Sequence, residues 1–365
     1  MTFALIATIL SSFFSALMVI YDRLMITDCY QNKPDQAWFV SSLLGTTLGL
    51  LFTAVVWAGV YFFSDSNLFN LLSEIWYPYG LWMLLAGILS IQAMRHYFRT
   101  FIPEKNDADI NETAISMWMA ATPIFVLFVV VLINYSGLNI GIFTNLDQAN
   151  ISWLFILATI LATVGIIGFE RASSDDEAVF GRKIYFREIG YMLFHFVLYT
   201  LIIFSVTQEL GKNYENLTLV SLALLPLYWL GFAYGLKLFL KSDFRKSFRE
   251  NFANIKYFAS PILIAEITGA LLYFFMFIGL GDLDPTLANL IFAGHIIIVF
   301  ILNLALKRLY ASLLEKGIDT WRLFGFTMTL NSLPKNGTAH LSTEIFFLIV
   351  ALLGIVIATN IVVVS

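Results

Sequence analysis

Long apolar segments alternate with short polar stretches along the whole of this 365-residue chain. A helix needs about 20 apolar residues to cross the hydrocarbon core of a bilayer. Ten segments have that character, and they span residues 3–21, 37–62, 79–98, 113–134, 151–169, 188–207, 217–240, 257–280, 285–306 and 341–364. Backbone groups in lipid must be satisfied within a helix, because no water is available there. The pattern therefore predicts an all-α polytopic membrane protein with ten transmembrane helices.

The positive charges fall almost entirely in alternate gaps between these segments. With the gaps numbered from one to nine, Lys212 is the only Lys or Arg residue that belongs to an even gap. Short loops rich in Lys and Arg remain in the cytoplasm. We therefore expect cytoplasmic odd-numbered loops and both termini outside, in a bacterial inner (cell) membrane.

Composition also indicates a membrane protein, and it limits the cofactors and partners that we expect. Hydrophobic residues make up 59% of the chain and charged residues only 13%, and the mean hydropathy is +0.81. The lone Cys29 cannot form an internal disulfide, and the four His residues form no metal-ligand cluster. We therefore expect no metal site and no cofactor. We expect no nucleic-acid partner either, since acidic residues outnumber basic ones.

An enzymatic function is not favoured by the motifs. The chain has no nucleophile elbow, no paired His residues on one helix face and no phosphate-binding glycine loop. Asp175, Asp176 and Glu177 could bind a metal ion in a polyprenyl-phosphate enzyme. A solvated linker is the better interpretation of that acidic run, so we expect no enzymatic activity.

Two segment pairs show internal similarity. The third segment aligns with the eighth, which pairs Gly87 with Gly269 at a constant spacing. The fourth aligns with the ninth, which pairs Ala121 with Ala293. Such matches indicate a five-plus-five duplication, and because five is odd the second copy must be inverted. We predict a first repeat at residues 1–170, a cytoplasmic linker at 171–187 and a second repeat at 188–365.

Several stretches carry a family resemblance. They read "YDRLM" (21–25), "LLAGILSIQAMRHYFRTF" (84–101), "ETAISMWMAATPIFVLFVVVL" (112–132) and "AEITGALLYFFMFIGLGDLDPTLANLIFAGHIIIVF" (265–300). The chain resembles the drug/metabolite transporter superfamily, in particular its EamA-like members with ten helices. That resemblance implies a secondary transporter, an exporter or exchanger, which moves a small polar or amphiphilic metabolite by alternating access. Most members are drawn with cytoplasmic termini, whereas the charges here place the termini outside.

Two other functions stay open. The basic inner surface could collect anionic headgroups, which is the property expected of a lipid-phosphate or lipid-linked-sugar translocase. An accessory membrane protein without transport activity is the third interpretation, because polar residues within the segments are sparse. A homodimer is also compatible with the sequence.

Glu266 is the first candidate for the transport chemistry, because it is the acid that lies well inside a segment. A charge at a helix centre costs about 2.5–3.5 kcal/mol on insertion scales, so such residues usually have a function. We predict that Glu266 couples transport to protons or binds a cationic group. The alternative is a carboxylate that extends to the cytoplasmic interface.

The other candidates for substrate binding or coupling are polar, aromatic or helix-breaking residues at similar depth: His295, His195, Trp118, Pro123, Gln92 and Asn289. For the histidines, hydrogen bonding to a neighbouring helix is the leading alternative to a proton relay. Pro123 should break or kink its helix. Trp118 could line a cavity or simply pack between helices.

Basic residues near the cytoplasmic ends of helices are candidates for binding lipid headgroups in the anionic inner leaflet. They are Arg95, Arg99, Lys241, Arg245, Lys246 and Arg249. The last four alternate with phenylalanines, a pattern that is typical of a helix lying in the membrane interface.

Overall fold

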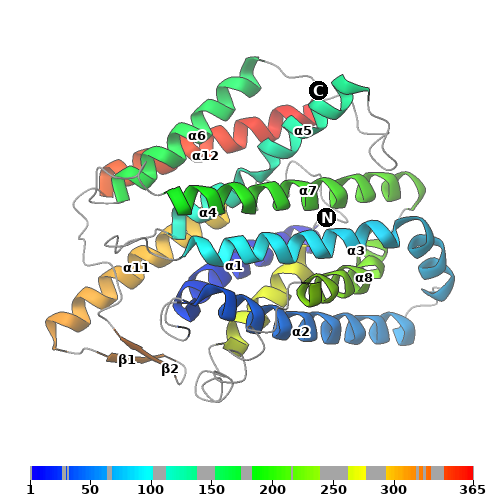
Figure 1. Cartoon of the computed structure of the whole chain (residues 1–365), viewed down its shortest axis with the longest axis horizontal. Coiled ribbons are helices and arrows are strands. Elements are labelled where there is room, and N and C mark those ends of the chain that lie inside the picture. The colour runs from blue at the N-terminus through cyan, green and yellow to red at the C-terminus, as the bar shows by residue number, and fades with distance from the viewer. Residues whose placement is uncertain are drawn as a thin grey trace.

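The computed structural model describes residues 2–26, 30, 33–63, 68–101, 112–137, 153–173, 183–214, 217–238, 262–276, 293–317, 320–323, 326–329 and 341–364. Within these ranges the fold is helical (Figure 1). The labelled elements are α1 (Thr2–Leu24), α2 (Pro34–Phe63), α3 (Leu68–Thr100), α4 (Glu112–Ala120), α5 (Thr122–Ser136), α6 (Trp153–Ser173), α7 (Lys183–Asn213), α8 (Leu217–Leu238), α11 (His295–Glu315), β1 (Thr320–Leu323), β2 (Phe326–Thr329) and α12 (Leu341–Val364). A further helix covers Ile262–Met276.

Helices occupy the described part of every predicted membrane segment. Seven of them are long and apolar enough to cross a bilayer, and two shorter apolar helices lie at Leu222–Leu238 and Ile262–Met276. The third predicted segment forms the C-terminal part of α3. The described residues therefore confirm a helical protein with several membrane spans.

Two details differ from the predicted segments. The fourth segment is divided into α4 and α5 by a turn at Ala121, close to Pro123. Proline has no backbone N–H to donate within a helix, so the predicted effect of Pro123 is confirmed as a break. The ninth gap contains a hairpin in which β1 pairs antiparallel with β2, with Thr320 opposite Thr329. The hairpin lies beside α11 at one end of the molecule (Figure 1).

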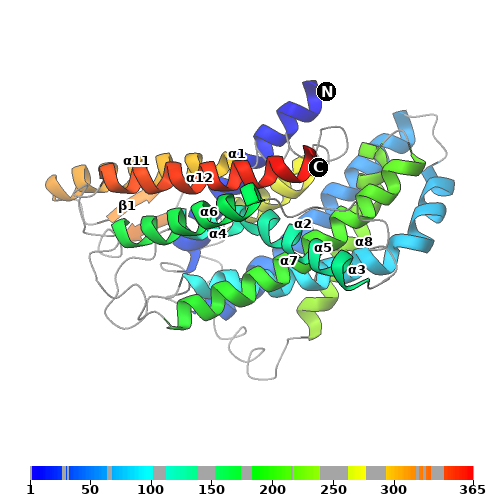
Figure 2. The same ribbon diagram turned by 90° about the horizontal axis from the view of Figure 1, so that it is seen from above.

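Two helix pairs cross at very short distances. A Cβ atom added to Gly231 of α8 would lie 2.1 Å from the backbone oxygen of Leu84 in α3, and one on Gly87 would lie 2.1 Å from the Tyr228 oxygen. In the α6–α12 pair, a Cβ on Gly165 would lie 2.3 Å from the Ala351 nitrogen. Figure 2 shows α6 and α12 side by side. Glycines permit such backbone contacts, which are common between membrane helices.

The remaining packing connects the two halves of the chain. Helix α3 packs against α7 as well as α8, and α2 also packs against α8. Helix α1 packs against α11, α4 against α11, and α5 against α7. The helix Ile262–Met276 contacts α1, where the Ser11 hydroxyl donates to the Leu272 carbonyl at 3.2 Å and the Phe14 ring stacks on Phe275.

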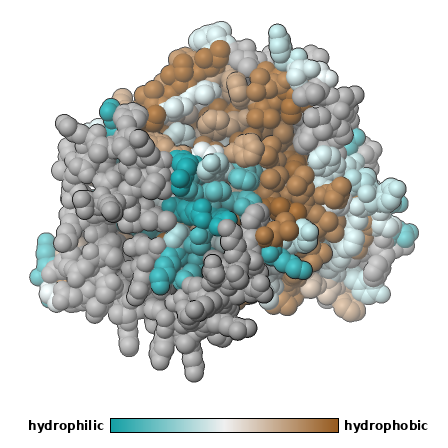
Figure 3. Space-filling view, viewed as in Figure 1, coloured by the Kyte–Doolittle hydropathy of each residue, from teal (hydrophilic) through white to brown (hydrophobic). Residues whose placement is uncertain are grey.

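Much of the outer surface is apolar. Phe62 is 75% exposed, Leu81 is 76% exposed and Phe346 is 60% exposed. Figure 3 shows broad hydrophobic surface next to a smaller hydrophilic patch. Exposed apolar area on this scale is unfavourable in water, but it suits contact with lipid tails. The fold and its surface therefore agree on a membrane environment.

Candidate functional site

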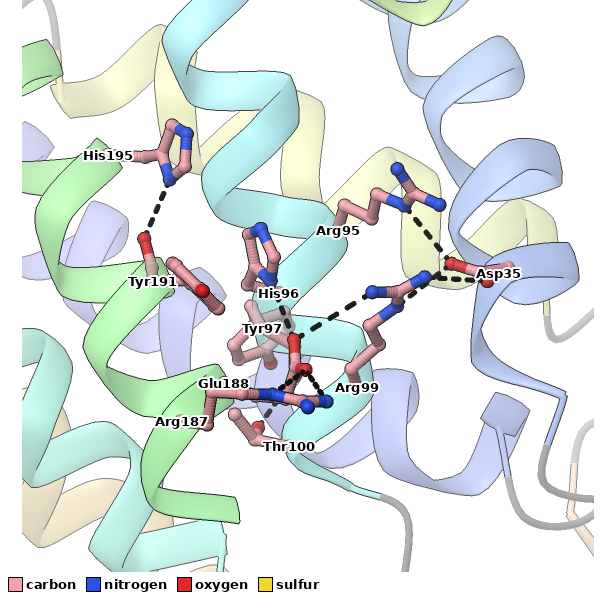
Figure 4. A network of polar contacts seen from close by, with 10 residues as sticks. All are labelled: Asp35, Arg95, His96, Tyr97, Arg99, Thr100, Arg187, Glu188, Tyr191 and His195. Atoms are coloured by element: carbon pink, nitrogen blue, oxygen red, sulfur yellow. Dashed lines mark hydrogen bonds and ion pairs between the residues drawn. The ribbon is translucent and has the colours of Figure 1, made fainter. Parts of the chain in front are cut away.

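A charged network joins three helices at one end of the bundle (Figure 4). Asp35, in the first turn of α2, accepts hydrogen bonds from Arg95 at 3.2 Å and from Arg99 at 3.1 and 2.9 Å. Both arginines lie in the last turns of α3. The Arg95 guanidinium also lies 5.5 Å from the centre of the Trp38 ring, within the range of a cation–π contact.

Glu188 of α7 connects the same network to the second half of the chain. Its carboxylate lies 2.6 Å from His96 Nδ1, accepts a hydrogen bond from Arg187 at 2.8 Å and lies 4.0 Å from Arg99. The Glu188 side chain is only 3% exposed. Because a buried carboxylate needs charged or hydrogen-bonding partners, these contacts hold α3 and α7 together.

The network also bears on the predicted alternation of loops. Asp35, Arg99 and Glu188 border the first, third and fifth gaps, and their contacts bring those three helix ends to one side of the bundle. The Tyr214 hydroxyl, beside the sixth gap, lies 3.5 Å from Glu74, beside the second. The described contacts therefore group the helix ends beside gaps one, three and five, and they join those beside gaps two and six.

We expect removal of the buried member of this network to be more destabilising than removal of the exposed one. Glu188→Gln should lower the free energy of unfolding by about 1.5–3 kcal/mol, since hydrogen bonds to a charged group are lost in a buried place. Asp35→Asn should cost only about 0.5–1 kcal/mol, because the Asp35 side chain is 39% exposed. Thermal unfolding in detergent micelles measures both, and a larger loss for Asp35→Asn would contradict this ranking.

A second polar centre is buried where α1, α4 and α11 meet. Glu112, 4% exposed, binds the Arg23 guanidinium of α1. Asn303 of α11 donates to the Glu112 carboxylate at 3.1 Å and to the Thr113 hydroxyl at 3.2 Å. The carboxylate thus has a charged partner and an amide partner, which is the pairing that makes burial of a charge tolerable.

Two more acids, Asp22 and Glu266, lie near this centre, and their neighbours are hydroxyl groups instead of the charged partner that Glu112 has. Asp22 is 2% exposed and faces the Tyr97 hydroxyl. Glu266 is 7% exposed and contacts the Ser41 hydroxyl of α2. A Cβ atom on Gly45 would lie 2.7 Å from Glu266 Oε2, so the carboxyl group rests directly on the α2 backbone. Glu266 is therefore buried among helices.

Trp118 and His195 have identifiable partners, and His295 is buried. The Trp118 indole N–H donates to Glu170 Oε1 at 2.9 Å, and the Tyr185 hydroxyl donates to the same oxygen at 2.7 Å. His195 Nδ1 lies 2.7 Å from the Tyr191 carbonyl, and its ring stacks 5.5 Å from the His96 ring. His295 is buried in α11 at 1% exposure. Trp118 is therefore hydrogen-bonded between helices, whereas the His195 hydrogen bond lies within α7 and only its ring contact reaches α3.

The other candidates are distributed differently. Gln92 is buried in α3, whereas Arg95 and Arg99, proposed as lipid ligands, both bind Asp35. Asn289, Lys241, Arg245, Lys246 and Arg249 lie outside the described residues.

Sequence reasoning gave no role to four acids that the structure buries: Asp22, Glu112, Glu170 and Glu188. Each lies near an end of its predicted segment, where an acid is normally assigned to the membrane surface. For Glu188, a signal that could have been used is the basic residue beside it in the sequence, Arg187, which donates a hydrogen bond to it.

Chemically, the described residues offer buried carboxyl groups, tyrosine hydroxyls and charged pairs. They contain no group of three or more His, Cys, Asp or Glu side chains arranged to hold a metal ion. Comparison with protein-family models finds no match, and comparison with curated proteins finds none either. Fold and site together define a helical membrane protein with several spans and a polar interior.

Proposed function

We propose that the chain consists of two inverted five-helix repeats, residues 1–170 and 188–365, joined by the linker 171–187. In these repeats α1 corresponds to α7, α2 to α8, α4 and α5 to α11, and α6 to α12. The packing supports the proposal when each helix is exchanged for its counterpart in the other repeat. The exchange turns the α1–α11 contact into α7–α5, and both contacts exist. The α2–α8, α4–α11 and α6–α12 pairs are each unchanged by the exchange, and all three are present. A twofold arrangement of two similar units accounts for this pattern.

Finer details support the same repeat. The sequence alignment that pairs Gly87 with Gly269 also pairs Leu84 with Glu266. Leu84 faces Gly231 of α8, and Glu266 faces Gly45 of α2. Since α2 and α8 are the second helices of the two repeats, the two aligned positions contact glycines of corresponding helices. The alignment also pairs Ala121 with Ala293. The turn at Ala121 has a counterpart one residue after that position, at Gly294.

We infer that the protein is a secondary transporter, an exporter or exchanger of a small polar or amphiphilic metabolite, of the drug/metabolite transporter type. The observation that carries this inference is the burial of Glu266 and Asp22 between α1 and α2 of one repeat and Ile262–Met276 of the other. Carboxyl groups at such a depth are costly unless they bind protons, ions or substrate. Rocking of one repeat against the other would expose them to each side in turn.

The lipid-phosphate translocase has less support. It needs arginines that are available to anionic headgroups, whereas Arg95 and Arg99 both bind Asp35 in the described structure. We therefore keep the metabolite transporter as the proposed function.

A Glu266→Gln variant tests the proposal. In proteoliposomes with an imposed pH gradient, we expect it to lower the rate of coupled transport by about ten-fold or more, because one charge-assisted interaction of ~1.5–3 kcal/mol is removed. The pH dependence of the remaining rate should also disappear. Glu74→Gln, a change at an exposed carboxylate, is the matched control. Unchanged rate and pH dependence in Glu266→Gln would exclude the coupling role.

We also propose that both termini face the outside of an inner membrane. A C-terminal reporter that folds only in the cytoplasm should therefore be inactive when fused to this chain, because the charge pattern holds the odd-numbered loops inside. The same reporter inserted in the 171–187 linker should be active. Strong activity of the C-terminal fusion would overturn this orientation.

A further inference from the structure

Asp22 and Glu266 differ from Glu112 and Glu188 in having no basic partner among the described residues. Among the described residues, Glu112 binds Arg23, and Glu188 contacts His96, Arg99 and Arg187. Among those residues, neither Asp22 nor Glu266 interacts with a Lys, Arg or His side chain.

Their contacts are with neutral hydroxyl groups, those of Tyr97 and Ser41. Asp22 Oδ2 has no hydrogen-bond partner within the described ranges. Asp22 also lies close enough to Glu266 for its charge to act on the Glu266 carboxyl group. Two neighbouring carboxylates in a low-dielectric place repel each other, so the pair favours the binding of a positive charge.

Aromatic rings stand next to this acidic pair. The Trp229 ring lies 5.5 Å from the Tyr273 ring, and the Tyr228 ring lies 5.6 Å from Tyr273. Tyr199 extends the group, with its ring 5.9 Å from Tyr228. Trp229 is 3% exposed, and its indole N–H has no hydrogen-bond partner among the residues described. This aromatic cluster therefore combines π faces with one indole N–H that has no partner among the described residues.

Helix α2 brings the acid and the rings together. Gly45 and Gly49 are one helical turn apart on α2, and a Cβ atom on Gly49 would lie 2.2 Å from the Trp229 ring. Glu266 rests on Gly45, so the carboxyl group and the indole contact α2 one helical turn apart. Tyr273 follows Glu266 two turns later on the same face of its helix. Asp22 is also close enough for its charge to act on Tyr273.

We propose that this site binds an organic cation: a protonated or quaternary amine that carries an apolar or aromatic group. The acidic pair would hold the positive charge, and Trp229, Tyr228 and Tyr273 would contact both the charge and the apolar body. Trp and Tyr rings attract cations, most strongly when water is excluded. This inference rests on the proposed transport function and narrows its substrate class, since the same site disfavours anionic metabolites.

Equilibrium binding to the purified full-length protein tests the proposal, with benzyltrimethylammonium as the probe because it carries a fixed charge at every pH. Its neutral carbon isostere, neopentylbenzene, and the anion phenylacetate are the matched ligands. We expect the cation to bind about ten-fold more tightly than either, since that difference corresponds to one charge interaction of ~1.4 kcal/mol. Equal binding of the cation and its neutral isostere would overturn the proposal, and this comparison requires no variant.

Variants then locate the site. Asp22→Asn and Glu266→Gln should each weaken binding of the probe by about ten-fold, and Trp229→Leu by about 3- to 30-fold, as expected for a desolvated cation–π contact. Glu74→Gln should leave the affinity unchanged. Probe affinity that is the same in folded Glu266→Gln, Asp22→Asn and wild-type protein would place the cation elsewhere and reject this site.

Transport measurements separate this inference from the function on which it rests. Uptake of a neutral or anionic metabolite by proteoliposomes, without binding of the cation, would reject the substrate class and leave the transporter intact. Absence of transport for cationic, neutral and anionic solutes alike would reject the transporter itself.

Discussion

Replacing Gly231 with leucine should prevent most of the protein from reaching a stable fold. A side chain at this position would meet the Leu84 backbone of α3, with its first carbon 2.1 Å from the carbonyl oxygen and 2.7 Å from the carbonyl carbon. Backbone atoms cannot move aside as a flexible side chain can. The α3–α8 crossing would have to open, at a cost of about 4 kcal/mol or more, at the upper end of single substitutions.

Gly59→Leu is the matched control for this experiment, because Gly59 lies in α2 with nothing within 4 Å of an added Cβ atom. Leucine there should be neutral or should stabilise by up to about 1 kcal/mol through its better helix propensity. Yield of monodisperse protein and its thermal midpoint in detergent measure both variants. A Gly231→Leu protein as stable as Gly59→Leu would show that the described crossing of α3 and α8 is wrong.

The second large effect is expected for Glu112→Gln. This change removes the carboxylate that the Arg23 guanidinium binds, in a place where the two side chains are 13% and 5% exposed. Removing one partner of a buried ion pair leaves the remaining charge poorly compensated and costs about 3–5 kcal/mol. We expect a similar loss for Arg23→Met, measured by chemical or thermal unfolding in micelles.

The double variant Arg23→Met/Glu112→Gln provides the control for the pair. Because no charge then remains uncompensated, its loss of stability should be smaller than the sum of the two single losses. Strict additivity would mean that Arg23 and Glu112 do not interact in the folded protein.

Hydropathy predicted the helices well because lipid allows few alternatives to an apolar helix. The ten predicted segments therefore coincide with helices wherever they are described, and the break near Pro123 follows from the chemistry of proline. The β1–β2 hairpin was not predicted, since the ninth gap carries no apolar period that would have indicated two strands. Starts and ends of helices were less well predicted than their existence, as α3 and α7 extend well beyond their apolar parts.

The polar interior was predicted only in part. Glu266 stood out because apolar residues surround it in the sequence. Asp22 and Glu188 did not, because burial of an acid near a helix end depends on which helix packs over it. The same reason explains Arg95 and Arg99: no local pattern pairs them with Asp35, which is distant in the sequence. Contacts between distant segments decide these roles, and one sequence does not contain them explicitly.

Alternating access to the Asp22 and Glu266 region is the central claim, and thiol labelling at Ser41 tests it most directly. Ser41 is 7% exposed and contacts Glu266, so a Ser41→Cys thiol in a Cys29→Ser background would report on that region. Ser73→Cys, at an exposed position, confirms that the reagent is active. We predict that a membrane-impermeant thiol reagent reaches the Ser41→Cys thiol from either side, at rates that change when substrate is added. Failure to label this thiol from one of the two sides under every condition would contradict a transport pathway through this site.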